Sequence, residues 1–266
     1  MTEDEKTALF VAGIRQALTM VIDPELGENV VIGPYSIIGE HVELGDNTEV
    51  QSHVVVDGHT RIGRNCRLFP FACIGMQTQD LKYAGGTTYA EIGDGTTLRE
   101  FATVHTGTRD GEVTRIGQKC LIMAYVHVAH GCRVGNEVIM SNAVQLAGEV
   151  EVDDMAIISG MTGVHQFTRI GRMAMIGAAT KIAQDVPPYM LVADNPAMVR
   201  GPNVVGMQRR NVPTESRSAI KQAYKLLYRE GLNHSQAIER IRAEVLDCPE
   251  VRELTSFVEK STRGIV

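Results

Sequence analysis

Residues 116–152 decide the fold, and they read IGQKCLIMAYVHVAHGCRVGNEVIMSNAVQLAGEVEV. An aliphatic residue returns at every sixth position of this stretch, from Ile116 to Val152. The same spacing extends outward in both directions, from Leu26 to Ile182 with two gaps, and gives 24 hexads that each begin with an aliphatic residue. Four positions after each leading residue stands Ser, Thr, Ala, Val or Cys.

A period of six matches neither the 3.6-residue period of a helix nor the two-residue period of an amphipathic strand. It indicates a short strand followed by a turn, with three strands closing one coil and the 24 hexads forming about eight stacked coils. The leading aliphatic residues are predicted to fill the interior and the small residues to fit the corners. Glycine follows the leading residue in eleven hexads, and we interpret it as the residue that supplies positive φ at tight corners.

The period also sets the expected domain organisation. Two insertions interrupt it, residues 80–91 and residues 110–115, and both are predicted to project outward as loops. We expect residues 1–25 to form an N-terminal cap that can be helical, residues 26–188 to form the repeat domain, and residues 189–266 to form a helical C-terminal domain. Within that last domain, Thr214 and Ser235 are predicted helix N-caps and Pro249 a first-turn residue.

Composition narrows the class of protein. The 266 residues carry 26 Lys and Arg against 32 Asp and Glu, a net charge of −6 that disfavours nucleic-acid binding. No apolar run approaches the roughly 20 residues of a membrane span, and the first twenty residues lack the basic start of a secretory signal. Five cysteines without a paired spacing favour reduced thiols, with Cys66, Cys120 and Cys132 in corner positions of the core. A cytoplasmic location is therefore expected.

Charge is unevenly distributed along the chain. Residues 203–229 contain six Lys and Arg against Glu215 as the one acidic residue, within an acidic protein. Charged helix faces are usually only solvated, but this excess favours a docking surface for an acidic partner or for phosphates.

Histidines supply the candidate chemistry. His105, His127, His130 and His165 fall in the middle and later coils, where coil spacing places them along one wall. His127 and His130 are not at leading positions, so a buried core role is not expected, and a surface role and a catalytic role are equally compatible with the spacing. A histidine suits a general base that deprotonates a hydroxyl, and Gly148, one coil beyond His130, could donate its N–H to an oxyanion.

A zinc site is the competing interpretation, because three histidines and an open position suit Zn²⁺ hydration chemistry. Some proteins of this architecture are zinc carbonic anhydrases. Their histidine pair is five apart, however, whereas His127 and His130 are three apart.

Longer motifs carry a more specific resemblance. The runs Gln79-Asp-Leu-Lys-Tyr-Ala-Gly85, Val128-Ala-His-Gly-Cys132, Leu146-Ala-Gly148 and Ala183-Gln-Asp-Val-Pro-Pro-Tyr189 resemble the acyl-[acyl-carrier-protein]–UDP-N-acetylglucosamine O-acyltransferases, the first enzymes of lipid A assembly. So do Ser52–Thr60, Gly160–Phe167, Gln208–Arg210, Ala223–Arg229 and Ser261–Gly264, so the similarity runs from about Asn29 to the end. The resemblance implies an all-β left-handed parallel β-helix followed by an α-helical domain, assembled as a homotrimer with active sites between neighbouring chains.

The resemblance also implies roles for individual residues. His130 would be the general base on the glucosamine 3-hydroxyl, and the Gly148 amide would stabilise the oxyanion. Asp80 and Lys82 would contact the acyl-chain hydroxyl and the sugar across the subunit boundary. Acyl carrier protein would deliver the 3-hydroxyacyl donor on its phosphopantetheine, so neither a metal nor a free cofactor is implied. The remaining implied positions are His127, His165, Gln166, Asn203 and Arg209 around the UDP-sugar, Ala178 for acyl length, and Arg210, Arg217, Lys221 and Lys225 for carrier-protein docking.

Two departures from the family pattern leave the acceptor open. The family often has an acidic residue after the base histidine, where this chain has Gly131, so the group that orients His130 is not identified. The family often has histidine after the oxyanion glycine, where this chain has Glu149. The alternatives are therefore a related acyltransferase acting on a 3-amino UDP-sugar or, further away, the zinc enzyme or a structural protein of this fold.

Overall fold

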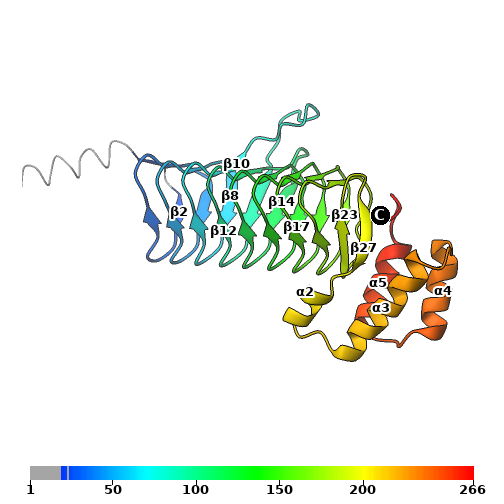
Figure 1. The fold of residues 1–266 in the computed structure, drawn as a ribbon. Coiled ribbons are helices and arrows are strands. Elements are labelled where there is room, and N and C mark those ends of the chain that lie inside the picture. The colour runs from blue at the N-terminus through cyan, green and yellow to red at the C-terminus, as the bar shows by residue number, and fades with distance from the viewer. Residues whose placement is uncertain (1–18, 23) are drawn as a thin grey trace, which may run out of the picture. The chain divides into compact units, whose positions relative to one another are not determined.

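The computed structural model describes residues 19–22 and 24–266, so most of the predicted N-terminal cap lies outside the described residues. The described chain is a left-handed parallel β-helix followed by helices, and the predicted fold class is confirmed (Figure 1). It divides into two compact units, a first unit that ends at Arg133 and a second unit, Val134–Val266.

The first unit contains three parallel sheets. Each sheet takes every third strand of the chain, so that β1 is followed by β4 and then by β7. Ile37 pairs with Val55 and Val55 with Cys73, so the register advances one coil at a time. The first sheet contains β1 (Met20–Val21), β4 (Ile37–Ile38), β7 (Val55–Val56), β10 (Cys73–Met76), β13 (Thr103–His105) and β16 (His127–Val128). The second contains β2 (Glu25–Leu26), β5 (Val42–Leu44), β8 (His59–Ile62), β11 (Tyr89–Ile92) and β14 (Val113–Ile116). The third contains β3 (Val31–Ile32), β6 (Glu49–Val50), β9 (Arg67–Leu68), β12 (Thr97–Leu98) and β15 (Leu121–Ile122).

The second unit continues the same order and then ends the repeat. Strand β17 (Arg133–Val134) spans the division between the units. The strands of the second unit are β18 (Ile139–Met140), β19 (Gln145–Leu146), β20 (Glu151–Val152), β21 (Ile157–Ile158), β22 (Gly163–Val164), β23 (Arg169–Ile170), β24 (Met175–Ile176) and β25 (Lys181–Ile182). Two further strands follow Pro188: β26 (Met190–Ala193) pairs in parallel with β24, and β27 (Met198–Pro202) pairs antiparallel with β26. Strand pairing therefore continues along the chain beyond the last hexad.

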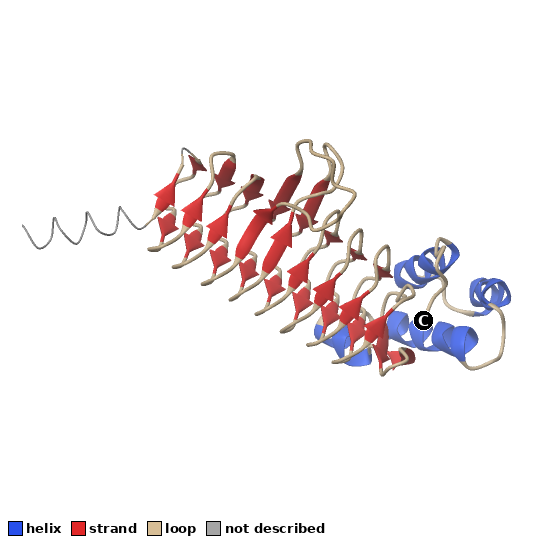
Figure 2. Cartoon of the chain, turned by 90° about the horizontal axis from the view of Figure 1, so that it is seen from above, coloured by secondary structure: helices blue, strands red, loops and turns tan. Residues whose placement is uncertain are grey.

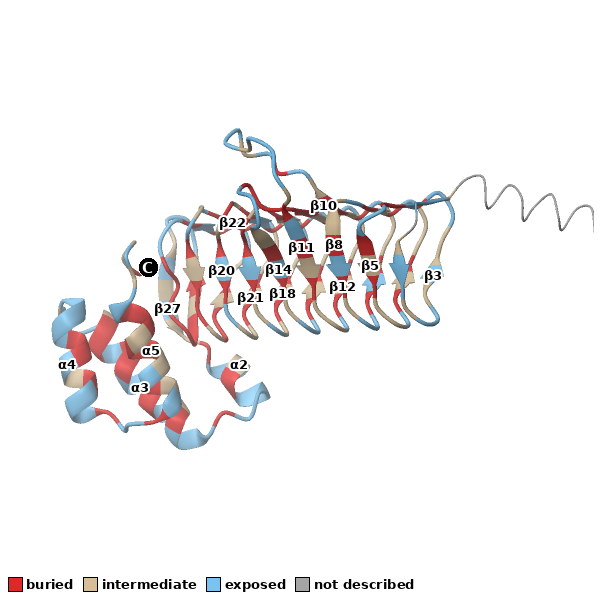
Figure 3. Ribbon diagram, turned by 180° about the vertical axis from the view of Figure 1, so that it is seen from behind, coloured by how far each residue is buried: buried red, intermediate tan, exposed pale blue. Residues whose placement is uncertain are grey.

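The leading residues form the core, as the hexad pattern predicts. Every leading residue from Ile38 to Ile182 is buried, with at most 4% of its surface exposed, and the buried positions repeat along the strands in Figure 3. Cys66, Cys120 and Cys132 are buried, which confirms their predicted core positions. Leu26, in the first hexad, is 46% exposed because, among the described residues, its strand has a neighbouring strand on one side only.

The role predicted for the glycine after the leading residue is correct at Gly75, whose φ is 82°, and wrong at the other ten such glycines. Positive φ occurs three positions after the leading residue, at residues such as Asn29 (56°), Phe71 (66°) and Tyr125 (62°). The glycine directly after the leading residue is needed for another reason. A Cβ on Gly33 would lie 2.7 Å from the Gln51 carbonyl carbon, and one on Gly45 would lie 2.7 Å from the Arg64 nitrogen, so glycine lets successive coils approach each other.

Both insertions leave the coil as loops, with bounds that differ from the predicted ones. The chain departs after Met76 and returns at Tyr89, so residues 89–91 belong to β11 and the loop comprises residues 77–88. It departs again after His105 and returns at Val113, so the second loop comprises residues 106–112.

The helices belong to the second unit and are drawn in blue in Figure 2: α2 (Val204–Arg209), α3 (Thr214–Tyr228), α4 (His234–Glu244) and α5 (Pro249–Glu259). Met173, Tyr189 and Met190 from the last coil share one buried cluster with apolar residues of all four helices. No helix in residues 19–22 and 24–266 combines the length and hydropathy needed to cross a membrane.

One helix boundary was predicted correctly and two were not. Pro249 is the first residue of α5, as predicted. Thr214 is the first residue of α3 rather than its N-cap, because the extended Pro213 precedes it. Asn233, not Ser235, caps α4, because Asn233 and Gln236 form a reciprocal capping box.

Candidate active site

His130 lies in the turn that follows β16, and it faces a carboxylate from the first outward loop. Its Nε2 is 3.6 Å from Asp80 Oδ2, and the two side chains are only 12% and 17% exposed. The turn is fixed on its other side by the Gly131 N–H, which donates to Thr114 Oγ1 at 2.9 Å. Asp80 and His130 are therefore brought together within one chain, although they are 50 positions apart in sequence.

The loop that carries Asp80 is held by short local bonds. The Asp80 N–H donates to Thr78 Oγ1, and the Lys82 N–H donates to Asp80 Oδ1, both at 3.0 Å. The bond from Lys82 lowers the pKa of Asp80, and the charges of His130 and Lys82 lower it further. Asp80 is accordingly a carboxylate at neutral pH, and it can accept a hydrogen bond from a bound hydroxyl.

His105 and His127 lie side by side on β13 and β16. Their rings meet edge to face with centroids 4.8 Å apart, and Thr103 Oγ1 is 2.7 Å from His127 Nδ1. Burial lowers the pKa of His127 to about 4 and also lowers that of His105, with the charge of the neighbouring histidines adding to both. Both rings are therefore neutral at pH 7, so they can act as hydrogen-bonding groups but carry no charge for a pyrophosphate.

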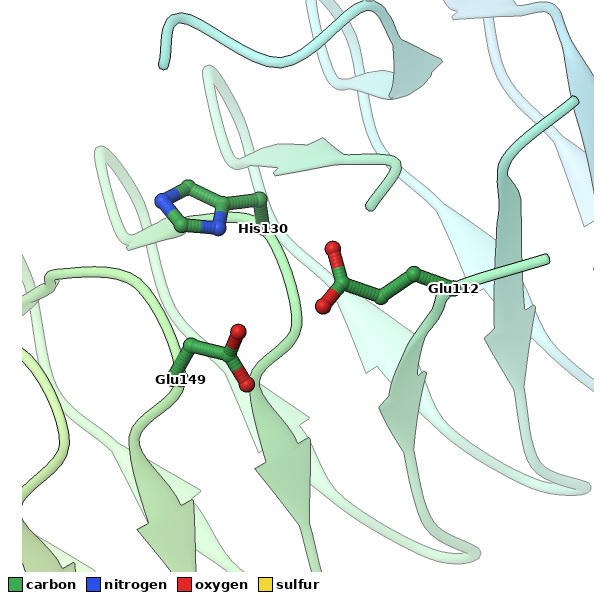
Figure 4. A group of neighbouring side chains, drawn as sticks. All are labelled: Glu112, His130 and Glu149. Atoms are coloured by element: carbon green, nitrogen blue, oxygen red, sulfur yellow. The ribbon is translucent and has the colours of Figure 1, made fainter. Parts of the chain in front are cut away.

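Glu112 lies beside His130, a position that the sequence did not predict. It ends the second outward loop, and its Oε2 accepts from the Thr108 N–H and, at 3.2 Å, from the Arg109 N–H. A Glu112 oxygen and a His130 ring nitrogen lie within 4.8 Å of each other (Figure 4). Only the outward direction of the loop could be predicted from the sequence.

The zinc interpretation required three histidines to converge. Among the described residues, His105, His127 and His130 do not form a group with metal-ligand spacing. The imidazole of His127 is instead held by Thr103.

In the second unit, Gly148 lies buried in the turn after β19. Its carbonyl accepts from the Phe167 N–H at 3.1 Å, while its own N–H donates no hydrogen bond within the described part of the chain. An undonated backbone N–H in a turn is the type of group that an oxyanion requires.

His165 and Gln166 follow β22. His165 Nδ1 is 3.0 Å from the Gln166 carbonyl oxygen and 3.2 Å from Arg263 Nη2. Arg263 lies in the quoted C-terminal motif, and nearby Ser261 donates to the buried Asp185 at 2.8 Å, so the end of the chain is fixed against the last coil of this unit.

Asn203 and Arg209 bound α2. Asn203 is 7% exposed, its Oδ1 accepts from the Gly206 N–H at 3.0 Å, and its Nδ2 donates to the Met173 carbonyl at 2.9 Å, so its amide caps the helix. Arg209 is exposed at the last position of α2, and Ala178 is exposed in the turn after β24.

The predicted docking cations differ in their surroundings. Lys221 and Lys225 are exposed one turn apart on α3. Arg217 is half-buried and donates to Thr214 Oγ1 at 2.9 Å, whereas Arg210 forms an ion pair with Glu137. Lys221 and Lys225 are thus the most accessible charges of this set.

Comparisons with known proteins indicate the same class of transferase as the β-helix fold and the turn that carries His130. The family model described as bacterial transferase hexapeptide (six repeats) matches residues 23–58 and 114–148. The model described as UDP N-acetylglucosamine O-acyltransferase, domain 2, matches residues 185–266. The chain is thus a hexapeptide-repeat transferase.

Curated relatives define the family more narrowly. The acyl-[acyl-carrier-protein]–UDP-N-acetylglucosamine O-acyltransferase of Thiobacillus denitrificans is 46% identical over 261 residues, covering 98% of this chain and 97% of the relative. The same enzyme of Herminiimonas arsenicoxydans is 47% identical over 255 residues, covering 93% and 97%. The solved UDP-N-acetylglucosamine acyltransferase of Bacteroides fragilis has a TM-score of 0.91 and 37% identity, covering 94% of this chain and 98% of that one. This chain belongs to the acyl-[acyl-carrier-protein]–UDP-N-acetylglucosamine O-acyltransferase family.

Proposed function

We propose that the chain transfers a 3-hydroxyacyl group from acyl carrier protein to the 3-hydroxyl of UDP-N-acetylglucosamine, the first step of lipid A biosynthesis. The observation that carries this proposal is the sheltered pair of His130 Nε2 and Asp80 Oδ2, 3.6 Å apart, in a chain that belongs to this family. The pair supplies a base for a hydroxyl and a carboxylate acceptor beside it.

The proposed reaction balances without any added cofactor. His130 Nε2 takes the proton from the sugar hydroxyl while the oxygen attacks the thioester carbonyl, and the Gly148 N–H stabilises the resulting oxyanion. The carbon–sulfur bond then breaks, and the imidazolium returns the proton to the phosphopantetheine thiolate. Ester and free thiol are the products.

Other residues are proposed to bind the substrates. Asp80 accepts from the hydroxyl of the acyl chain and Lys82 contacts the sugar, while the neutral His127 donates or accepts a hydrogen bond without adding charge. Asn203 is proposed to act at the UDP moiety chiefly by fixing α2, because its amide is engaged in the cap. His165, Gln166 and Arg209 are proposed to hold the UDP moiety directly, and the Ala178 methyl is proposed to limit acyl length.

We further propose a cytoplasmic homotrimer as the working form. The family resemblance supports this assembly, and a substrate carried on acyl carrier protein is consistent with that compartment.

Mass spectrometry of the reaction products tests the function. Purified protein is incubated with 3-hydroxyacyl carrier proteins of several chain lengths and with UDP-N-acetylglucosamine or its 3-amino analogue in separate reactions. We expect an ester product with the natural sugar. Product with the amino analogue alone would show that the acceptor is an amine, consistent with the departures at Gly131 and Glu149. No product with either sugar would refute acyl transfer.

Docking of the carrier protein is tested on α3. Reversing two exposed charges in Lys221→Glu/Lys225→Glu is expected to raise KM for the acidic carrier protein about tenfold while leaving kcat nearly unchanged, because electrostatic steering governs encounter. Lys260→Glu reverses a charge at an exposed position just after α5 and is the matched control. An equal KM for the double variant and the control would contradict docking at α3.

A further inference from the structure

His130 has one ring nitrogen without a partner. Nε2 faces Asp80, but Nδ1 is buried and has no hydrogen-bond partner among the described residues. Buried polar atoms in folded proteins are normally paired, so an orphaned nitrogen on a candidate base calls for a physical explanation. The next residue cannot supply a partner, because Gly131 has no side chain and its N–H is bonded to Thr114.

Glu112 offers a second carboxylate beside the His130 ring. Its oxygen lies within 4.8 Å of a His130 ring nitrogen, and Figure 4 shows the carboxylate directed toward the ring. Since Nε2 is the nitrogen that faces Asp80, Nδ1 is the one left for Glu112.

The second outward loop fixes the position of the Glu112 side chain. Two backbone N–H groups, from Thr108 and Arg109, donate to Oε2 of Glu112. Gly107 leaves the room for this side chain, because a Cβ there would lie 2.5 Å from Glu112 Cβ and 2.7 Å from its Cγ. A carboxylate has about four acceptor sites, so it can serve these donors and a further one.

We propose that Glu112 is the positioning residue for His130, accepting the Nδ1–H directly after a small side-chain rotation or through one water. This inference rests on the proposed function, in which His130 is the base. A proton fixed on Nδ1 leaves the lone pair on Nε2, which is the nitrogen directed to the substrate side. The carboxylate also stabilises the imidazolium that forms after proton transfer, as the acid of a catalytic triad does.

Among the described residues of the first unit, Asp80, Glu112, His105 and His127 are titratable neighbours of His130. Asp80 lies at Nε2 and Glu112 lies on the Nδ1 side, and both are acids. His105 and His127 have lowered pKa values, chiefly through burial, and part of the lowering comes from His130 itself. These two rings are neutral near pH 7, so they add no charge of their own beside His130.

Glu112→Gln tests the proposal, because the amide oxygen still accepts from Thr108 and Arg109 while the charge is lost. We expect kcat to fall at least about tenfold with little change in KM. The acid limb of the pH profile of kcat/KM should move to lower pH, because the lost carboxylate no longer favours the protonated ring. Glu91→Gln is the matched control, since Glu91 pairs with Arg115 on the surface of β11 and β14.

A measurement independent of activity accompanies the kinetics. In ¹⁵N-histidine-labelled protein, with the His130 signal assigned by its loss in His130→Ala, the nitrogen shifts report which ring nitrogen carries the proton. We expect the proton on Nδ1 in the unmodified chain. This measurement reports the position of the proton whether or not acyl transfer is found.

Three results would overturn the inference. The first is a neutral His130 ring with its proton on Nε2. The second is a Glu112→Gln variant whose kcat, and whose acid limb in the pH profile of kcat/KM, match those of Glu91→Gln. The third is an acid limb that moves in Glu149→Gln but not in Glu112→Gln. Failure of acyl transfer in the unmodified chain would instead refute the proposed function, so the two failures are distinguishable.

Discussion

Replacing His130 with alanine is expected to lower kcat for acyl transfer by about a hundred- to ten-thousandfold, the usual contribution of a positioned general base. The physical reason is that three of its described titratable neighbours, Asp80, His105 and His127, are poor substitutes as bases. Asp80 has a lowered pKa and is a weak base, and the burial of His105 and His127 lowers their pKa values as well. KM should change little, because the imidazole acts mainly on the transition state.

The control for this prediction is His41→Ala. His41 stacks on His59 at 4.4 Å between ring centroids, on the surface of the second sheet, and it has no role in the proposed reaction. Both variants are measured in the mass-spectrometric assay, with thermal melting to verify folding. A folded His130→Ala protein with at least a tenth of the normal kcat would refute the assignment of His130 as the base.

The interior of the fold could be predicted because one rule applies to every hexad. A leading aliphatic residue has a neighbour above and below it in the same sheet, so burial follows from spacing alone, as at Leu98 between Leu68 and Ile122. The corner conformation could not be predicted in this way. Positive φ is imposed by the turn and is accepted by side chains as large as Phe101 and Tyr125, whereas glycine occurs where two backbones meet.

The sequence could predict only those residues of the candidate site that lie in the hexad repeat or in the quoted motifs. Spacing placed His105 and His127 on one wall, and the structure shows their rings in contact. The Glu112 position depends instead on how a seven-residue loop folds through its own bonds to Thr108 and Arg109, which no period encodes. The cap of α4 was missed for a similar local reason, since Asn233 competes with Ser235 and is favoured by its pairing with Gln236.

The core rule itself leads to the second large effect, which concerns stability. Leu98→Ala is expected to destabilise the protein by about 3 kcal/mol, because it removes a side chain that is 0% exposed and leaves a cavity between two paired coils. Leu98 pairs with Leu68 on one side and with Ile122 on the other, and both of these are also 0% exposed. The backbone bonds of the coil prevent the neighbours from collapsing fully into the space.

Thermal unfolding at fixed protein concentration measures this effect, and the loss corresponds to a fall in Tm of about 6–12 °C for a chain of this size. Leu81→Ala removes the same atoms from a side chain that is fully exposed in the first loop, so its Tm should remain within about 2 °C of the parent value. Equal melting temperatures for the two variants would mean that the leading residues do not carry the stability of the coils. Because stacked coils are stabilised by their nearest neighbours, a loss at Leu98 should also weaken the adjoining coils, including the one that presents His130.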